Sequence, residues 1–171
     1  MDQLLNVKTI LILMTIGIEM IHAHPVLAVS DDIVKQSIER EVEADFRLRG
    51  TMVAFDVLQG FVILRGKVNL YIKKMLYERI AWTTVGVIEV ENEIRVIPAL
   101  PVTDDVIKRQ VMDAFHAHQR LADINAVITV EAGVVFIQAT FDDPHDVQKL
   151  KHKVAGIQGV VEIRIQAEFV S

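Results

Sequence analysis

Hydrophobic and polar residues alternate along three stretches in the first half of the chain. Successive side chains of a β-strand point to opposite faces of the sheet, so each stretch directs its apolar residues to one face. The pattern therefore predicts three strands with a common buried side. Their inward positions are Val53, Phe55 and Val57 in the first strand, Val62, Leu64, Gly66 and Val68 in the second, and Val90, Ile94 and Val96 in the third.

Apolar residues at helical spacing predict one helix before these strands and a second helix between the second and third strands. A first helix is expected after Ser30, a residue type that caps helix N-termini, and the carboxylates of Asp31 and Asp32 suit the first turn of a helix. A second helix is expected from Asn69 onward, between the second and third strands. The inward faces would contain Ile33, Ile38, Val42 and Phe46 in the first helix, and Ile72, Leu76, Ile80 and Thr83 in the second.

The whole pattern occurs twice, at a constant offset along the chain. Gly60 falls on Gly133 and Gly86 on Gly159, and a shift by one further position pairs Ile80 with Val154. Such self-similarity indicates a duplicated structural unit. In the second copy Thr103 is the expected first cap, and Asp143 followed by Pro144 marks the start of the second helix. Its expected inward residues are Val106, Val111 and Phe115 in the first helix and Ile163, Ile165 and Phe169 in the last strand.

These elements predict an α/β fold, more specifically an α+β sandwich of two repeated helix-strand-strand-helix-strand units. Each unit would be a small three-stranded mixed sheet covered on one face by two helices. The expected domains are residues 30–97 and 103–171, separated by a linker at residues 98–102 that contains two prolines. Proline restricts the backbone, so the linker is expected to be semi-rigid.

Glycines occupy matching positions in the two copies. Gly60 and Gly133 are expected to supply the positive φ of a tight hairpin turn. Gly66 would lie on the inward face, where a side chain would hold a helix away, and Ala139 takes its place in the second copy. Gly86 and Gly159 are expected to end the second helices as left-handed caps.

Residues 1–28 have the pattern of a secretory signal peptide. Residues 9–18 are apolar, Lys8 precedes them, and small residues follow at residues 26–28. The exported chain would then begin near Val29. An uncleaved anchor is the less favoured alternative, because a spanning helix needs about 20 apolar residues.

Composition narrows the classes of function. With 51% hydrophobic and 24% charged residues, the chain of 171 residues is expected to fold around a real core. Its net charge of −5 argues against the broad basic footprint of a nucleic-acid-binding protein. The absence of cysteine excludes disulfides, thiolate metal sites and a lipid-modified N-terminal cysteine.

The glycine and valine spacing resembles that of the BON domain, named for bacterial osmotic-stress and nodulation proteins. The pattern lies at Gly60, Val62, Leu64, Gly66 and Val68, continues at Ile80 and Ala81, and ends with GVIEVENEIRV at residues 86–96. The second copy keeps Gly133, Val135, Ile137, Gly159, Val160 and Ile163 but has Ile165 in place of Asn92. The resemblance implies an exported, non-catalytic envelope protein that contacts phospholipid or other envelope components. Because the chain has no cysteine, the soluble periplasmic members, which include osmotically inducible proteins, are a closer match than the lipoprotein members.

The sequence contains no arrangement of side chains typical of a catalytic or metal-binding site. His116 and His118 would point apart on a helix, and His145 and His152 share a helix face without a third ligand. Asp142, Asp143 and Asp146 are explained by helix capping. We therefore expect no enzyme activity, no cofactor and no metal site.

A stripe on the second helix of the first unit is the main candidate for a binding surface. Tyr71, Met75 and Trp82 lie beside the core-facing stripe, with Lys74 and Arg79 on either side. Aromatic rings beside cations suit the headgroup region of an anionic membrane. The second copy contributes Lys149, Lys151 and Lys153 on the matching helix. The alternative is that Tyr71, Met75 and Trp82 pack against the first helix or the other unit.

A second candidate surface is the outer face of each sheet. Phe61 and Ile63 in the first unit, and Val134 and Phe136 in the second, would point away from the helices. Apolar patches of this kind mark contacts with a partner or between domains. The sequence thus leaves two hypotheses for a periplasmic protein: association with phospholipid surfaces, or a chaperone-like module that binds envelope proteins or a second copy of itself.

Overall fold

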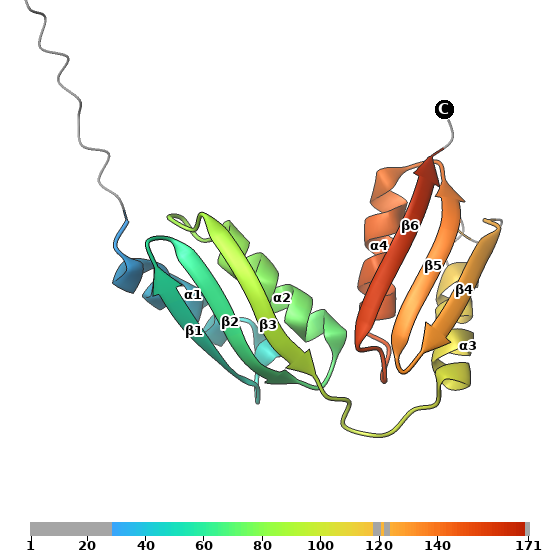
Figure 1. Ribbon diagram of the computed structural model, residues 1–171, viewed down its shortest axis with the longest axis horizontal. Helices are drawn as coiled ribbons and strands as arrows, with labels where there is room; N and C mark the ends of the chain where they lie inside the picture. Colours follow the sequence, from blue (N-terminus) through green and yellow to red (C-terminus); the bar gives the residue numbers. More distant parts are fainter. Residues whose placement is uncertain (1–28, 118–120, 122–123, 170–171) are drawn as a thin grey trace, which may run out of the picture.

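Two three-stranded sheets, each with two helices on one face, make up the chain (Figure 1). The computed structural model describes residues 29–117, 121 and 124–169. The expected signal peptide at residues 1–28 lies outside the described residues. The first unit contains α1 (Asp31–Ala44), a 3-10 turn (Phe46–Leu48), β1 (Met52–Leu58), β2 (Phe61–Val68), α2 (Tyr71–Thr83) and β3 (Glu89–Val96). The second contains α3 (Asp104–His116), β4 (Ala126–Glu131), β5 (Val134–Phe141), α4 (Pro144–Ala155) and β6 (Glu162–Phe169).

Strand pairing is the same in both sheets and confirms the predicted repeat. β1 pairs with β2 antiparallel and β2 with β3 parallel, and β4, β5 and β6 follow the same order and directions. The parallel pair requires a crossover, which α2 and α4 provide. Each unit has its own buried core, one around Val34, Leu64 and Leu76 and the other around Ile107, Ile137 and Leu150. The shift by one position in the second helix is confirmed, since Leu76, Ile80 and Ala81 are buried and so are Leu150, Val154 and Ala155.

The first helices are rotated slightly from their predicted orientation. Ile33 is 55% exposed, whereas the adjacent Val34 is fully buried. In the second unit the buried residue is likewise Ile107, and the predicted Val106 is only half-buried. The prediction for Phe46 was also wrong, because this residue enters the 3-10 turn and is 70% exposed, leaving Leu48 to fill the core. Two neighbouring apolar residues fit the helical period about equally well, and only the packing selects one.

Other boundaries differ slightly from the prediction. α2 begins at Tyr71 rather than Asn69, with Leu70 at the N-cap, and Thr83 at its end is exposed. Pro144 begins α4 as predicted, and the side chain of Asp143 accepts a hydrogen bond from the amide of His145 at 2.8 Å. Phe169, predicted to face inward, is half exposed at the end of β6.

Gly60 and Gly133 occupy hairpin turns with φ values of +79° and +77°, as predicted. Gly86 and Gly159 also have positive φ, but they lie in the turn after the helix and are not its caps, which are Thr84 and Gly156. A Cβ on Gly60 would lie 2.6 Å from the carbonyl oxygen of Gly86. The two turns of the unit therefore touch through their backbones, and no side chain fits between them.

Gly66 has a different role from the one predicted. A Cβ at this position would lie 2.6 Å from the carbonyl oxygen of Met52 and 3.0 Å from the Cα of Val53. Both atoms belong to β1, the strand paired with Gly66, and neither belongs to a helix. Gly66 therefore permits close approach between the two strands of the hairpin, while Ala139 pairs with Ala126 at the matching position.

An aspartate links the first helix of each unit to its hairpin turn. The carboxylate of Asp31 accepts hydrogen bonds from the amides of Gln59 at 2.8 Å and Gly60 at 3.0 Å. Asp104 accepts the equivalent pair from Ala132 and Gly133, both at 2.9 Å. The sequence pattern explained these aspartates by the helix dipole alone. The structure shows that one of each pair joins two elements.

Candidate functional site

α2 is the element that carries the predicted binding stripe, and its buried side is fixed by the first core. Leu76, Tyr77, Ile80 and Ala81 are buried on this side. On β3, the side-chain amide nitrogen of Asn92 donates to the carbonyl oxygen of Lys74 at 3.2 Å and to the carboxylate of Glu78 at 2.8 Å. These bonds fix how α2 is rotated on the sheet, and so decide which of its other side chains reach solvent.

The aromatic stripe divides into two parts. Tyr71 and Met75, near the start of α2, pack against the core of the second unit, and Ile72 contacts both cores. Burial raises the pKa of the Tyr71 hydroxyl, with smaller contributions from the carboxylates of Glu78 and Glu162. Trp82, in the last turn, is 50% exposed. The start of α2 thus serves the contact between units, as in the packing alternative, while its end is open to solvent.

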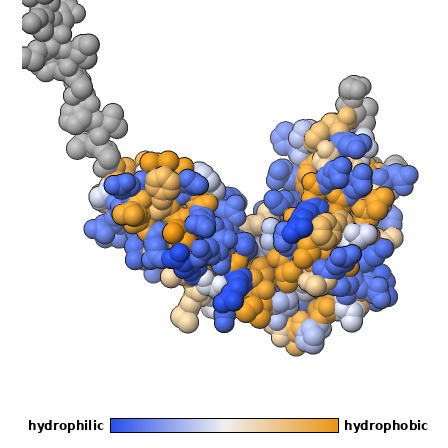
Figure 2. All heavy atoms as spheres, in the orientation of Figure 1, coloured by the Kyte–Doolittle hydropathy of each residue, from blue (hydrophilic) through white to orange (hydrophobic). Residues whose placement is uncertain are grey.

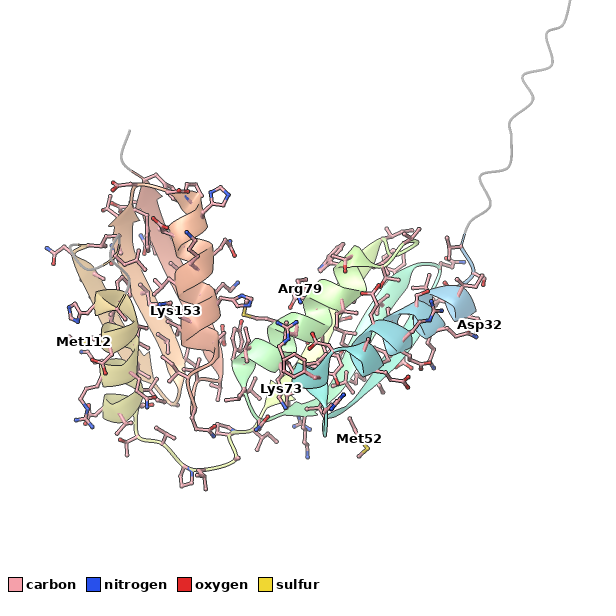
Figure 3. All side chains as sticks on the ribbon, turned by 180° about the vertical axis from the view of Figure 1, so that it is seen from behind. Asp32, Met52, Lys73, Arg79, Met112 and Lys153 are labelled. Carbon is pink, nitrogen blue, oxygen red and sulfur yellow. The ribbon has the colours of Figure 1, made fainter. Side chains whose placement is uncertain are left out.

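The predicted cations also differ in their availability. The ammonium group of Lys74 donates to the carbonyl oxygen of Ile94 at 2.8 Å, so it stabilises the first unit internally. Arg79 is exposed on α2, and Lys149 and Lys153 are exposed on α4. Figure 3 labels Arg79 on α2 and Lys153 on α4. Arg79 lines a hollow with Glu41 and Asp45 at the end of α1. The ammonium group of Lys149 lies 3.6 Å from the carboxylate of Asp146.

Large apolar side chains gather at the end of the first unit that carries the Gly60 turn. Leu58 and Phe61 flank this turn, and the amide of Ile88 donates to the carbonyl oxygen of Gly60 at 2.8 Å. Val85 lies in the adjoining turn, shortly after Trp82. The exposed fractions are 72% for Leu58, 47% for Phe61, 78% for Val85 and 65% for Ile88. We call these four residues the apolar tip, and Figure 2 shows hydrophobic residues at this end of the first unit.

Sequence reasoning included Phe61 but missed the other three residues of the apolar tip. They belong to neither an amphipathic helix nor the alternating part of a strand, and so stand outside both periodic patterns. A useful signal would have been the concentration of large apolar residues around two predicted turns, where polar residues are usual.

The outer sheet faces differ between the units. In the first, Ile63 is half-buried and lies in register with Asp56 and Glu91, so its apolar surface is bordered by carboxylates. In the second, the guanidinium of Arg164 lies over the ring of Phe136, 5.2 Å from its centroid. Val127 and Thr129 on β4 help to line a shallow hollow of about 480 Å³ on this face. Val134, at the start of β5, is half-buried and is not among the residues that line the hollow.

Arg164 also forms an ion pair with Glu162 on this face. The guanidinium of Arg164 donates to the carboxylate of Glu162 at 2.7 Å, and this hydrogen bond is the main reason that the pKa of Glu162 is lowered. Arg164 is therefore held between a carboxylate and an aromatic ring, which fixes one wall of the hollow.

The predicted histidines lie apart. His145 contacts the carboxylate of Asp143 through its Nδ1 at 2.8 Å, while His116 ends α3 and His152 lies in the last turn of α4. His118 lies outside the described residues. Among the residues that the structure describes, no group of three histidines or acidic residues is placed to hold a metal ion. Within the same residues, no helix combines the length and apolar character needed to cross a membrane.

Comparison with known proteins finds the BON domain family over residues 30–98, which is the first unit. No curated protein sequence matches the chain. Similar solved structures include CdsD, a structural protein of the type III secretion system of Chlamydia trachomatis, at 9% identity and a TM-score of 0.29, covering 79% of this chain and 91% of that one. The C-terminal domain of CdsD also matches at 9% identity and a TM-score of 0.29, covering 84% and 100%. Similarity this low supports no inference about function.

Proposed function

Because residues 30–98 form a BON domain, a non-catalytic binding type of domain typical of envelope proteins, we propose that the chain binds the surface of anionic phospholipid membranes in the periplasm. The second unit, with the same topology, completes a tandem BON protein. Export by the N-terminal apolar segment and a role in osmotic or envelope stress are parts of this proposal.

The observation that carries the proposal is the exposure of Trp82 beside an exposed cationic side chain. Trp82 is 50% exposed and Arg79, one helical turn earlier on α2, is exposed as well. An indole ring has an apolar body and one polar N–H group, and it is favoured at the boundary between headgroups and acyl chains. The apolar tip lies at the same end of the unit and adds area that could enter this boundary.

Electrostatics supports an anionic surface in spite of the net negative charge of the chain. Arg79 is exposed on α2, and Lys149 and Lys153 are exposed on α4. Each cation near an anionic membrane contributes about 1 kcal/mol, which is about fivefold in affinity. Tyr71, Met75 and Lys74 are left out of the proposed surface, because they are engaged within the protein.

Vesicle flotation tests the proposal. At low salt, the wild-type protein should float with vesicles containing phosphatidylglycerol and should remain unbound with vesicles of phosphatidylcholine alone. Trp82→Ala should weaken binding about fivefold to tenfold, and Arg79→Glu by about as much, because each removes one of the few groups that contact the surface. The emission of Trp82 should shift to shorter wavelength when anionic vesicles are added.

Met52→Ala is the matched control for loss of an exposed apolar side chain. Met52 is 90% exposed at the start of β1, away from the Gly60 turn, and its replacement should leave flotation unchanged. Absence of the wild-type protein from anionic vesicles, or equal binding by the wild type and Trp82→Ala, would contradict the proposal.

The hollow on the outer face of the second sheet favours a second candidate function, in which the chain is a protein-interaction or chaperone-like module. Arg164 and Phe136 form a fixed cationic and aromatic wall there. Phe136→Asp should abolish self-association or capture of an envelope partner, measured by sedimentation and cross-linking, while flotation with anionic vesicles stays unchanged. Reduced flotation with unaltered association would count against this role.

A further inference from the structure

The hollow that Arg79 lines is bordered by charged side chains of both signs. It has a volume of about 500 Å³, within the range of sites that bind small ligands. α1 and α2 lie side by side on the first sheet and form its two walls (Figure 1). Arg79 and Ile80 line it from α2, and the remaining lining residues, at the end of α1 and in the 3-10 turn, are Glu41, Ala44, Asp45, Phe46 and Arg47. We call it the Arg79 hollow.

Two of the four charged groups in the Arg79 hollow neutralise each other. The Nε of Arg47 donates to the carboxylate of Asp45 at 2.8 Å, and the backbone amide of Arg47 donates to the same carboxylate at 3.0 Å. These hydrogen bonds from Arg47 lower the pKa of the Asp45 carboxyl, and the charge of Arg79 adds a smaller effect in the same direction. Asp45 and Arg47 therefore form a pair whose charges cancel.

The other two charged groups are available to a ligand. Glu41 and Arg79 are both exposed, and neither side chain forms an ion pair within residues 29–117, 121 and 124–169. A molecule in the Arg79 hollow would therefore meet one cation and one carboxylate, a combination that suits a zwitterion better than a simple anion.

Aromatic surface lies close to these charges. Phe46, which lines the Arg79 hollow, is 70% exposed, and Trp82, one helical turn after Arg79, is 50% exposed. Exposed rings of this kind are favoured where headgroups meet acyl chains. The zwitterion that best fits these surroundings is thus a lipid headgroup rather than a soluble metabolite.

We propose that the Arg79 hollow binds the headgroup of phosphatidylethanolamine, with Arg79 on the phosphate and Glu41 on the ammonium group. The inference rests on the proposed membrane function and names the headgroup that this part of the surface selects. A guanidinium matches a phosphate through paired N–H donors. A primary ammonium group offers N–H donors to the carboxylate of Glu41, whereas the trimethylammonium group of phosphatidylcholine has none. Phosphatidylglycerol supplies the negative surface charge but has no cation for Glu41.

Two vesicle types of equal net charge test this selectivity. Both contain the same fraction of phosphatidylglycerol, and the remainder is phosphatidylethanolamine in one and phosphatidylcholine in the other. We expect the wild-type protein to bind the ethanolamine vesicles about threefold to fivefold more tightly, measured by titration of the Trp82 fluorescence. Glu41→Gln should bind the two vesicle types equally, because the neutral amide no longer pairs with the ammonium group.

Glu43→Gln is the matched control. Glu43 is exposed on α1 and does not line the Arg79 hollow, so its replacement removes the same charge from the same helix. This variant should keep the wild-type preference for ethanolamine vesicles. Both variants should bind anionic vesicles slightly more tightly than the wild type, since each removes one negative charge, and their circular dichroism spectra should be unchanged.

The outcomes separate this inference from the proposed function. Equal binding of the wild type to both vesicle types overturns the inference and leaves the membrane function in place, whereas absence of binding to both contradicts the two together. A preference that persists in Glu41→Gln would assign it to the looser packing of ethanolamine lipids and also overturns the inference. Soluble glycerophosphoethanolamine should bind about a hundredfold more weakly than the vesicles, because it lacks the contacts of Trp82 and α4 with the membrane. Equally tight binding of this compound would assign the Arg79 hollow to a soluble zwitterion.

Discussion

Replacing Gly60 with alanine should destabilise the first unit by about 3 kcal/mol or more. Two costs combine at this position. The φ of +79° is unfavourable for a residue with a side chain, and the new methyl group would lie 2.6 Å from the carbonyl oxygen of Gly86. This oxygen belongs to the backbone of the neighbouring turn, so it cannot rotate away. Relief requires the two turns to separate, which also strains the hydrogen bond between Ile88 and Gly60.

Gly50→Ala separates the two costs. Gly50 has a similar φ of +74°, but no atom lies within 4 Å of the position that its Cβ would take. Only the backbone strain remains, so a loss of about 1 kcal/mol is expected. Urea unfolding followed by the fluorescence of Trp82 reports the first unit selectively, because this is the only tryptophan. Equal losses for the two variants would show that contact between the turns does not contribute.

Replacing Asp31 with alanine should lower the free energy of unfolding of the first unit by about 2 kcal/mol. The carboxylate accepts hydrogen bonds from two backbone amides of the hairpin turn, Gln59 and Gly60. Without it, α1 loses a direct connection to the turn, and both amides must find water instead. The same denaturation experiment measures the effect.

Asp32→Ala is the matched control for Asp31→Ala. Asp32 lies in the same first turn of α1 but is exposed, so the two aspartates have a similar relation to the helix dipole (Figure 3). Its loss should cost no more than about 0.5 kcal/mol. Similar losses for both variants would mean that the helix dipole, and not the hairpin turn, accounts for the effect of Asp31.

The sequence was sufficient for the duplicated architecture, because strand alternation, glycine spacing and the constant offset between the copies are local or periodic signals. The predictions from sequence were wrong where the environment of a residue depends on a second element that is distant in the sequence. Whether Ile33 or Val34 enters the core depends on the sheet beneath α1, and the role of Gly66 depends on the backbone of β1. The hydrogen bonds that Asp31 accepts come from a turn much later in the chain, and no repeating pattern in the sequence indicates them. The sequence analysis therefore explained this carboxylate by the helix dipole.

The candidate site was predictable only in part for a similar reason. Helical spacing places Tyr71, Met75 and Trp82 along one stripe, but it contains no information about where a second unit touches that stripe. The contact covers the start of α2 and leaves Trp82 exposed. The apolar tip, built from turns, could be recognised only after the two turns were seen to meet.

The exchange of Asn92 for Ile165 distinguishes the two crossover helices. Asn92 requires a carbonyl group and a carboxylate at set positions on α2, so any sliding of that helix would break directional bonds. Ile165 packs against the second core through an apolar side chain, and such non-directional contacts tolerate displacement along a helix axis. The two copies also differ in length just before this helix, where the second copy has one residue more than the first. We therefore expect the second unit to tolerate the insertion or deletion of a residue beside α4 better than the first unit tolerates it beside α2.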